Sequence, residues 1–120
     1  MPSGDVAGEV RAFVEVVGAR VVFAIEAMGT RVAMLELSSE PPAILLAGHL
    51  EGERPVLVYR VARLDDAVAT LEARGWDPQH RFEIPHGPCC LLELPGGHRV
   101  AFYELTRPEV IDNFIGRRDF

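Results

Sequence analysis

The chain has 120 residues, the length of a single domain, and its 48% hydrophobic and 25% charged residues are ordinary for a globular protein. The net charge of −6 argues against nucleic acid as a partner, because phosphate binding needs clustered Lys and Arg. No apolar run approaches the roughly 18–20 residues of a membrane span and no secretory signal is visible, so we expect a cytoplasmic protein without a membrane partner.

The two cysteines are neighbours in the sequence. Cys89 and Cys90 would point to opposite faces of a strand, and adjacent cysteines rarely bond without strain. We therefore expect free thiols in a reducing compartment.

The first half of the chain predicts one helix followed by three strands. Apolar residues recur at helical spacing over 5–17, Asp5 is a candidate N-cap and Gly18 a C-terminal stop. Strand-like runs follow, separated by turn residues, at 20–26, 31–37 and 43–47.

The second half predicts a strand, a helix and three further strands. The expected strands are 55–61, 80–84, 89–94 and 99–105, and the expected helix is 65–73. A tail, 106–120, carries a short apolar run over 108–116. Its apolar residues share one helical face and predict that the tail packs on the body: Val110, Ile111, Phe114 and Ile115.

The two halves are related by an internal repeat of 57 residues. Segment 15–18 (EVVG) aligns with 72–75 (EARG), 34–37 (MLEL) with 91–94 (LLEL), and 43–46 with 100–103. Such periodicity is typical of one supersecondary unit used twice. We therefore expect units at about 5–48 and 55–105, and the first unit lacks its opening strand or keeps only a stub in residues 1–4.

A doubled βαβββ unit of this kind resembles the vicinal oxygen chelate superfamily of glyoxalases, bleomycin-resistance proteins and extradiol dioxygenases. The resemblance is carried by 58–68, which is similar to the family's strand-to-helix entry, and by 95–104, which is similar to its last turn and strand. It implies an α+β fold in which two βαβββ-type units form a curled mixed sheet around a cavity, with the first strand of the N-terminal unit missing or reduced.

The resemblance also implies where a metal would be held in the family's enzymes. Its four ligand positions map to Val56, Ala101, Ile44 and the absent opening strand. Apolar side chains have no lone pairs to donate. We therefore expect no metal and no cofactor, and the usual basis for enzymatic activity is missing.

Strand alternation predicts the face of the second unit that a ligand would meet. Leu57, Tyr59 and Val61 should face the helix, so the opposite face takes the other set. The candidate ligand-binding residues are Val56, Val58, Arg60, Ala101 and Tyr103, together with Ile44 from the first unit. Arg60 has two interpretations, an anchor for an anionic ligand or an ion pair with a carboxylate on a neighbouring strand, such as Glu93. Tyr103 either donates to a ligand or lines the wall.

His86 and Cys89 flank a Gly-Pro turn. A histidine this close to a thiol is the most unusual local feature of the sequence. One interpretation is a structural turn with a buried thiol, and the other is a nucleophile and base. We keep both residues as candidates for ligand contact.

Together these features favour a metal-independent binding protein for a small organic molecule, assembled as a homodimer. The alternatives are a lyase, isomerase or dioxygenase-like enzyme with relocated ligands, and a vestigial dimer with a structural role.

Overall fold

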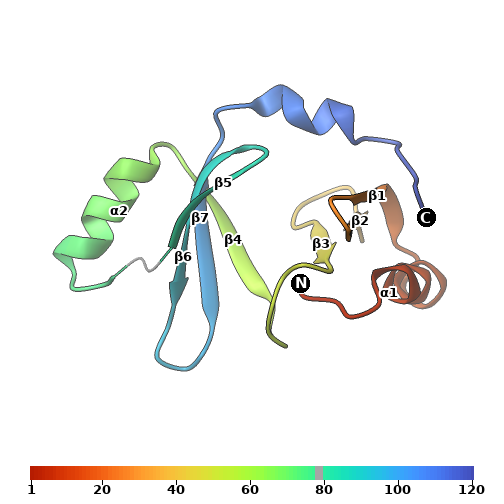
Figure 1. Cartoon of the computed structure of the whole chain (residues 1–120), viewed down its shortest axis with the longest axis horizontal. Coiled ribbons are helices and arrows are strands. Elements are labelled where there is room, and N and C mark those ends of the chain that lie inside the picture. Colours follow the sequence, from red (N-terminus) through yellow and green to blue (C-terminus); the bar gives the residue numbers. More distant parts are fainter. Residues whose placement is uncertain (78–79) are drawn as a thin grey trace. The chain divides into compact units, whose positions relative to one another are not determined.

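The computed structural model describes residues 1–77 and 80–120 and divides into two compact units. The first unit is Met1–Glu53 with Asp112–Phe120, and the second is Arg54–Ile111. Each unit places one helix against one sheet (Figure 1). No described helix has both the length and the apolar character needed to cross a membrane.

The first unit begins with a capped helix. Helix α1 (Val6–Ala12) continues as a π-helical turn, η1 (Phe13–Val17), and ends at Gly18, where φ is 75°. The Asp5 side chain caps the helix by accepting a hydrogen bond from Gly8 N at 3.0 Å. The expected helix and both of its end signals are confirmed, although its last turn is wider than the α-helix that the spacing predicts.

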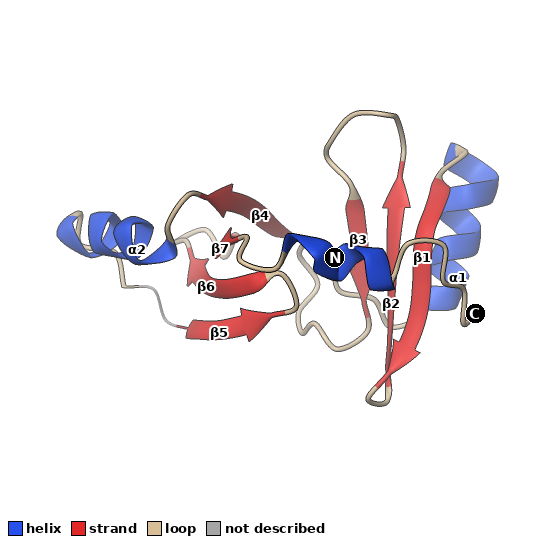
Figure 2. Ribbon diagram, turned by 90° about the horizontal axis from the view of Figure 1, so that it is seen from above, coloured by secondary structure: helices blue, strands red, loops and turns tan. Residues whose placement is uncertain are grey.

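Three antiparallel strands form the first sheet in the order β1 (Arg20–Ala27), β2 (Thr30–Glu36) and β3 (Ile44–Ala47). Val6 and Val10 of α1 pack with Ala24, Ala33 and other buried residues of the sheet. Helix α1 accordingly lies along one side of the three strands (Figure 2).

The opening strand of the first unit is reduced to a stub. Pro2 forms a parallel bridge with Ala47, Ala47 N donates to Met1 O at 3.0 Å, and Ser3 N donates to Ala47 O at 3.3 Å. These bonds occupy the outer edge of β3, which is where the repeat predicts the opening strand.

The second unit contains the complete set of elements. Its strands are β4 (Val56–Val61), β5 (His80–Ile84), β6 (Gly87–Glu93) and β7 (Arg99–Glu104), and its helix is α2 (Leu64–Ala73). The sheet order is β4-β7-β6-β5, with β4 parallel to β7 and the other pairs antiparallel. Leu64 and Val68 of α2 pack on Cys90, flanked by Val61 and Phe102. The α+β class with two βαβββ-type units is confirmed, and the strands form two separate sheets that are not closed.

The 57-residue repeat holds for two strands of the first sheet and fails for the third. Residues 23–27 of β1 pair with 30–34 of β2 in the same register as 80–84 of β5 pair with 87–91 of β6, which lie 57 positions further along the sequence. However, Leu35 pairs with Ile44 whereas Leu92 pairs with Val100, so one more residue separates the first pair. A shift of one residue turns every side chain of a strand to the other face.

This shift corrects the placement of Ile44. Ala101 pairs with Leu91, and the corresponding residue Met34 pairs with Leu45. The structural counterpart of Ala101 is therefore Leu45. Ile44 instead packs against the hydrophobic cluster beneath α1.

The C-terminal tail pairs with β1 after the short 3-10 helix η2 (Pro108–Asn113). Residue 118 bridges Ala24 in parallel, and Phe120 packs against the first unit's core. Phe114 contacts Phe23 with ring centroids 5.6 Å apart, whereas Ile115 remains 56% exposed. The tail therefore lies at the opposite edge of the sheet from the stub and does not occupy the place of the missing strand.

Gly87 is required by packing as well as by conformation. Its φ is 154°, and a Cβ added there would overlap the carbonyl oxygen of Glu104 and lie 2.8 Å from Thr106 Oγ1. We expect Gly87→Ala to lower the free energy of unfolding by about 3 kcal/mol, measured by urea denaturation, because the backbone of the hairpin must shift. Gly4→Ala is the matched control, since a Cβ there meets nothing within 4 Å. Equal stability of the two variants would contradict this packing.

Met28 occupies a turn position that suits another residue better. Met28 and Gly29 join the paired residues Ala27 and Thr30 and have φ values of 53° and 77°, as a type I′ hairpin turn requires. The Met28 side chain is fully exposed, so no packing compensates for its left-handed backbone. We expect Met28→Asn to raise the free energy of unfolding by about 1 kcal/mol, read from the denaturation midpoint. A loss of stability would show that Met28 makes a contact that its exposure does not reveal.

Candidate functional site

Among the described residues, the second sheet has α2 packed on one face and no helix packed on the other. Tyr59, Phe102 and Cys90 are paired across β4, β7 and β6 and lie on the α2 side, where the rings of Tyr59 and Phe102 stack at 6.1 Å. The alternating residues point the other way. This helix-free face carries seven of the eight sequence-predicted site residues or their immediate neighbours: Val56, Val58, Arg60, Ala101, Tyr103, Cys89 and His86.

The hydrogen-bond register brings four of these residues together. Arg60 pairs with Tyr103, and Tyr103 pairs with Cys89 on its other side. The ring of His86 meets Tyr103 edge-on, with centroids 6.1 Å apart. Val58 and Ala101 form the neighbouring pair, so the charged head of Arg60 is flanked by apolar and aromatic groups.

The side chain of Arg60 forms no hydrogen bond and no ion pair within residues 1–77 and 80–120. Glu93, its expected partner, is paired in register with Arg99, four residues along β7 from Tyr103. That separation is about 13 Å along the strand, too far for an ion pair. The Arg60–Glu93 pair therefore does not form, and the guanidinium keeps its donors for another acceptor.

His86 is held by a dense set of hydrogen bonds around its turn. Thr106 N and Arg107 N both donate to His86 O at 3.0 Å. The Arg107 side chain donates to Pro85 O at 2.8 Å, to Ile84 O at 2.7 Å and to Glu83 at 2.8 Å. Burial lowers the pKa of His86, and the nearby charge of Arg107 lowers it further. The imidazole is therefore neutral near pH 7, on a backbone that is fixed in place.

Cys89 is a buried thiol rather than an activated one. Its side chain is paired between Tyr103 and Phe82, and the residue is 3% exposed. Burial, together with the adjacent Cys90, raises the pKa of Cys89 to about 11. Because only the thiolate is a nucleophile, this environment favours the interpretation of a structural turn with a buried thiol. Neither cysteine is in a disulfide, as expected.

The residues at the family's metal positions do not fit a metal. Val56 and Ala101 lie on the helix-free face, and the register assigns Leu45 to the third position. None of these side chains has a donor atom, and the fourth position belongs to the strand that is reduced to a stub. In the described part of the chain, no group of three or more His, Cys, Asp or Glu side chains is placed to hold a metal.

Two contributions to the site were not predicted from the sequence. Phe82 and Leu91 share the helix-free face with Cys89 and Ala101, and Phe82 is 44% exposed. Alternation along the expected strands could have identified both. The role of Arg107 in holding the His86 turn could not have been found, because it depends on a contact between residues that are distant in the sequence.

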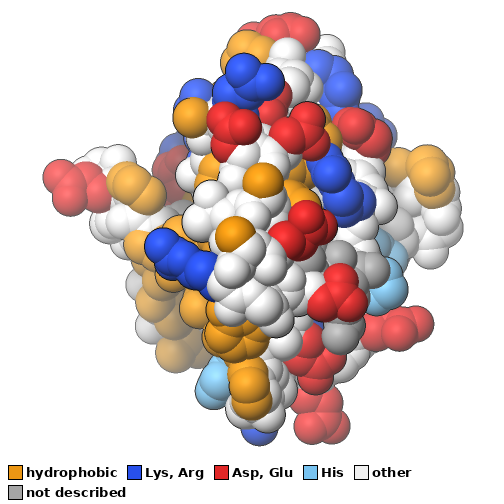
Figure 3. Space-filling model, turned by 90° about the vertical axis from the view of Figure 1, so that its left-hand side faces the viewer, with side chains coloured by type: hydrophobic (Ala, Val, Ile, Leu, Met, Phe, Trp, Pro, Cys, Tyr) orange, Lys and Arg blue, Asp and Glu red, His pale blue; other side chains and the backbone are white. Residues whose placement is uncertain are grey.

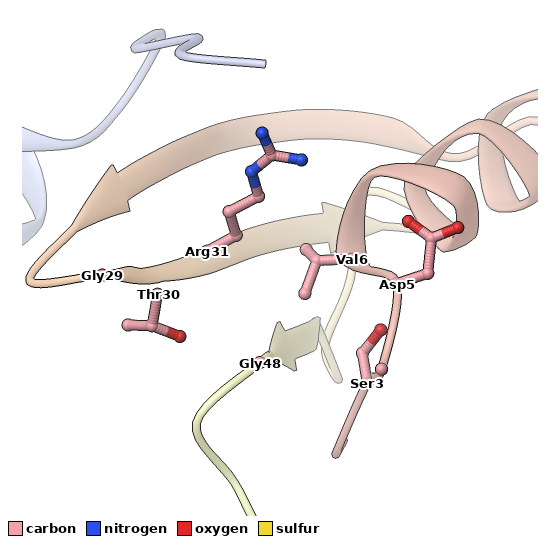
Figure 4. Close-up of a pocket in the computed structure, with 8 residues that line it drawn as sticks. Ser3, Asp5, Val6, Gly29, Thr30, Arg31 and Gly48 are labelled. Carbon is pink, nitrogen blue, oxygen red and sulfur yellow. The ribbon is translucent and has the colours of Figure 1, made fainter.

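A separate recess of about 260 Å³ lies in the first unit, between residues 3–6, the hairpin residues 29–31 and Gly48 (Figure 4). Ser3 Oγ is buried beside it and has no hydrogen-bond partner among the described residues. The Asp5 carboxylate is engaged by the helix cap, and Arg31 is engaged by Glu26 at 3.1 Å. The two charged side chains around this recess, Asp5 and Arg31, are therefore engaged within the protein.

On the side of the second unit that carries α2, acidic and basic side chains are interspersed with hydrophobic ones (Figure 3). Ion pairs link several of them, including Arg81 with Asp65 at 2.6 Å and Arg63 with Asp66 at 3.7 Å. This mixture does not form the continuous basic surface that nucleic acid needs.

No protein-family model matches the chain, and no curated protein matches it. Solved structures do match. Methylmalonyl-CoA epimerase from Mycobacterium tuberculosis is 16% identical, with a TM-score of 0.69 over 89% of this chain and 85% of the epimerase. The hypothetical protein BH1468 from Bacillus halodurans C-125 is 14% identical, with a TM-score of 0.69 over 86% of this chain and 88% of its own.

A glyoxalase/bleomycin resistance protein from Streptomyces sp. CB03234 also matches, at 19% identity over 86% of this chain and 94% of its own, but its TM-score of 0.41 carries no further argument. At these identities the likeness concerns the fold alone. The arrangement of two βαβββ-type units and these structural matches together show that the chain has the fold of the vicinal oxygen chelate superfamily.

Proposed function

We propose that the chain is a metal-independent binding protein for a small organic anion, which lies on the helix-free face of the second sheet with its negative group at Arg60. The observation that carries this proposal is a guanidinium without a partner in the described residues, next to Tyr103 and flanked by Val58 and Ala101. A guanidinium offers a rigid fork of donors that matches a carboxylate or phosphate.

The surroundings of Arg60 support an anion with an apolar body. Val58 is 56% exposed and Phe82 is 44% exposed on this face, so a ligand would cover apolar surface as well as meet a charge. His86 is neutral and Cys89 is protonated near pH 7, so neither competes with the ligand for Arg60. Tyr103 lies beside Arg60, and its hydroxyl can donate a hydrogen bond to a second acceptor on the ligand.

The same groups disfavour covalent catalysis. A thiol with a raised pKa is a poor nucleophile, and the apolar residues at the family's metal positions supply no ligands for a Lewis acid. The unbonded cysteines support the proposed cytoplasmic location. The outer edges of β4 and β5, which no strand of the second sheet covers, support the proposed homodimer.

A thermal-shift screen identifies the ligand class. Aromatic carboxylates, organic phosphates and polycyclic or peptide antibiotics should be tested with and without a chelator such as EDTA. We expect anionic hits whose shift is the same in both conditions. Binding that disappears in EDTA would overturn metal independence.

Replacing Arg60 tests the anchor. We expect Arg60→Met to keep the melting temperature of the free protein and to weaken an anionic hit by about 2 kcal/mol, measured by titration calorimetry, because a charge-assisted hydrogen bond is lost. Arg74→Met, at the C-terminal end of α2, removes the same charge elsewhere and should leave the affinity unchanged. Equal affinity of the two variants would show that the ligand does not use Arg60.

The state of Cys89 gives a pH-dependent prediction. With its pKa raised from 9.0 to about 11, Cys89 at pH 8 should react with iodoacetamide roughly 100-fold more slowly in the folded protein than in guanidinium. The unfolded thiol ionises first, so protein stability should fall as the pH rises from about 9 to about 11. Rapid alkylation of Cys89 in the folded protein, located by mass spectrometry, would instead indicate an activated nucleophile.

A further inference from the structure

The register of the second sheet places four residues in one row across the helix-free face. Arg60 of β4 pairs with Tyr103 of β7. Tyr103 in turn pairs with Cys89 of β6, which pairs with Phe82 of β5. Neighbouring strands lie about 4.8 Å apart, so three spacings separate the ends of this row by about 14 Å. Arg60 and Phe82 therefore lie on the same face, at opposite margins of the sheet.

The ring of Phe82 has no ring partner among residues 1–77 and 80–120, and Phe82 is 44% exposed. On the other face of the same sheet, by contrast, Tyr59 stacks on Phe102 at 6.1 Å. An exposed ring can form an offset-stacked or edge-to-face contact with a second ring. One end of the row thus offers a guanidinium and the other end offers an aromatic surface.

The surface between these two ends is apolar or uncharged. The next row of the face brings Val58, Ala101 and Leu91 into register, and Leu91 is the diagonal neighbour of Phe82. In the first row, the raised pKa of Cys89 keeps its thiol neutral near pH 7. An apolar chain can therefore pass from Arg60 to Phe82 without burying a charge of the protein.

The other arginines of β5 and β7 are engaged. Arg81 pairs in register with Cys90 on the α2 side, where it forms an ion pair with Asp65 at 2.6 Å. Arg99 donates a hydrogen bond to the carbonyl oxygen of residue 54. An acidic group on this face therefore finds its cation at Arg60, which fixes the direction in which a ligand lies.

We propose that the ligand is an elongated carboxylate with an aromatic ring at its far end, and that Phe82 is the contact for this ring. This inference rests on the function proposed above, because it takes Arg60 as the anchor of the acidic group. A carboxylate carries one negative charge, which Arg60 balances, whereas a phosphate monoester carries close to two near pH 7. The apolar linker of the ligand lies over Val58 and Leu91.

Two acids of different length test the span. ω-Phenylbutyrate and ω-phenyloctanoate share the acid and the ring, but only the longer one extends from Arg60 to Phe82. We expect ω-phenyloctanoate to bind at least about 10-fold more tightly, measured by titration calorimetry in EDTA, because its linker and ring cover apolar surface. Equal affinities, or no binding of the longer acid, would overturn the elongated ligand. Tighter binding of ω-phenyloctyl phosphate would overturn the carboxylate.

Replacing Phe82 tests the ring contact. We expect Phe82→Leu, shown to be folded by circular dichroism, to bind ω-phenyloctanoate about 5-fold more weakly and ω-phenylbutyrate with unchanged affinity. Tyr59→Leu is the matched control, since it removes a 53% exposed ring from the α2 side and should leave both affinities unchanged. ω-Cyclohexyloctanoate has no aromatic ring and should bind the Phe82→Leu variant as it binds the parent protein. An unchanged affinity for ω-phenyloctanoate, or an equal loss with the cyclohexyl acid, would overturn the ring contact.

Arg60→Met distinguishes failure of this inference from failure of the proposed function. This variant should bind both phenyl acids about 30-fold more weakly, since each places its carboxylate at Arg60. A loss with Arg60→Met but not with Phe82→Leu would overturn the elongated ligand and leave the proposed function in place. Unchanged affinity in Arg60→Met would overturn the proposed function itself.

Nuclear Overhauser effects locate the ring directly. In the complex of the whole chain with ω-phenyloctanoate, we expect effects between the ring protons of the ligand and the side chains of Phe82 and Leu91. Effects to Tyr59 or to other side chains of the α2 side, without effects to Phe82, would place the ring elsewhere and overturn the inference.

Discussion

One helix covers one face of one sheet in each unit, and most features of the protein depend on this one-sided burial. Small side chains allow the helices to approach closely: Ala24 and Ala33 beneath α1 and Cys90 beneath α2 are completely buried. Larger residues on the helices, such as Leu64 and Val68, fill the space above them. Because side chains alternate along a strand, packing on one face necessarily presents the intervening residues on the other. The helix-free face of the second sheet, with Arg60 and Tyr103, is a direct consequence.

The two sheets differ in whether their outer strands are paired with a further segment of the chain. In the first unit both outer strands have a paired neighbour, the stub at β3 and the tail at β1. In the second unit the sheet ends at β4 and β5, without a further paired strand among the described residues. Unpaired strand edges promote association. The repeat has therefore produced two similar units, and only in the first are both outer strands paired with a further segment among the described residues.

The chemical character of the helix-free face depends on which arginine side chains are paired with a carboxylate and which are not. Arg81, Arg63 and Arg107 are each engaged by a carboxylate, whereas Arg60 is surrounded by Tyr103, Val58 and Ala101. The raised pKa of Cys89 and the lowered pKa of His86 have the same main cause, since burial disfavours the charged form of each group. A cation flanked by neutral groups is suited to holding an anion, and these neutral groups are poorly suited to moving protons or forming covalent bonds.

The sequence by itself determined the elements, the repeat and the faces of the second sheet. Helical and alternating periodicities are local signals, so the α-helices and strands of the described residues and the helix-facing set Leu57, Tyr59 and Val61 could be predicted from them. The fold followed from the order of these elements and from the resemblance carried by segments 58–68 and 95–104.

Only the tertiary structure decided the register and the partners. The connection before β3 is one residue longer than its counterpart before β7, so Leu45 rather than Ile44 is equivalent to Ala101. The periodicity of apolar residues does not indicate the length of such a turn. Three features depend on residues that are far apart in the sequence. Arg60 is not paired with Glu93, Arg107 donates hydrogen bonds to the turn that contains His86, and the tail docks on β1. Such contacts are selected by the packing of complete elements, which is why local sequence patterns do not contain them.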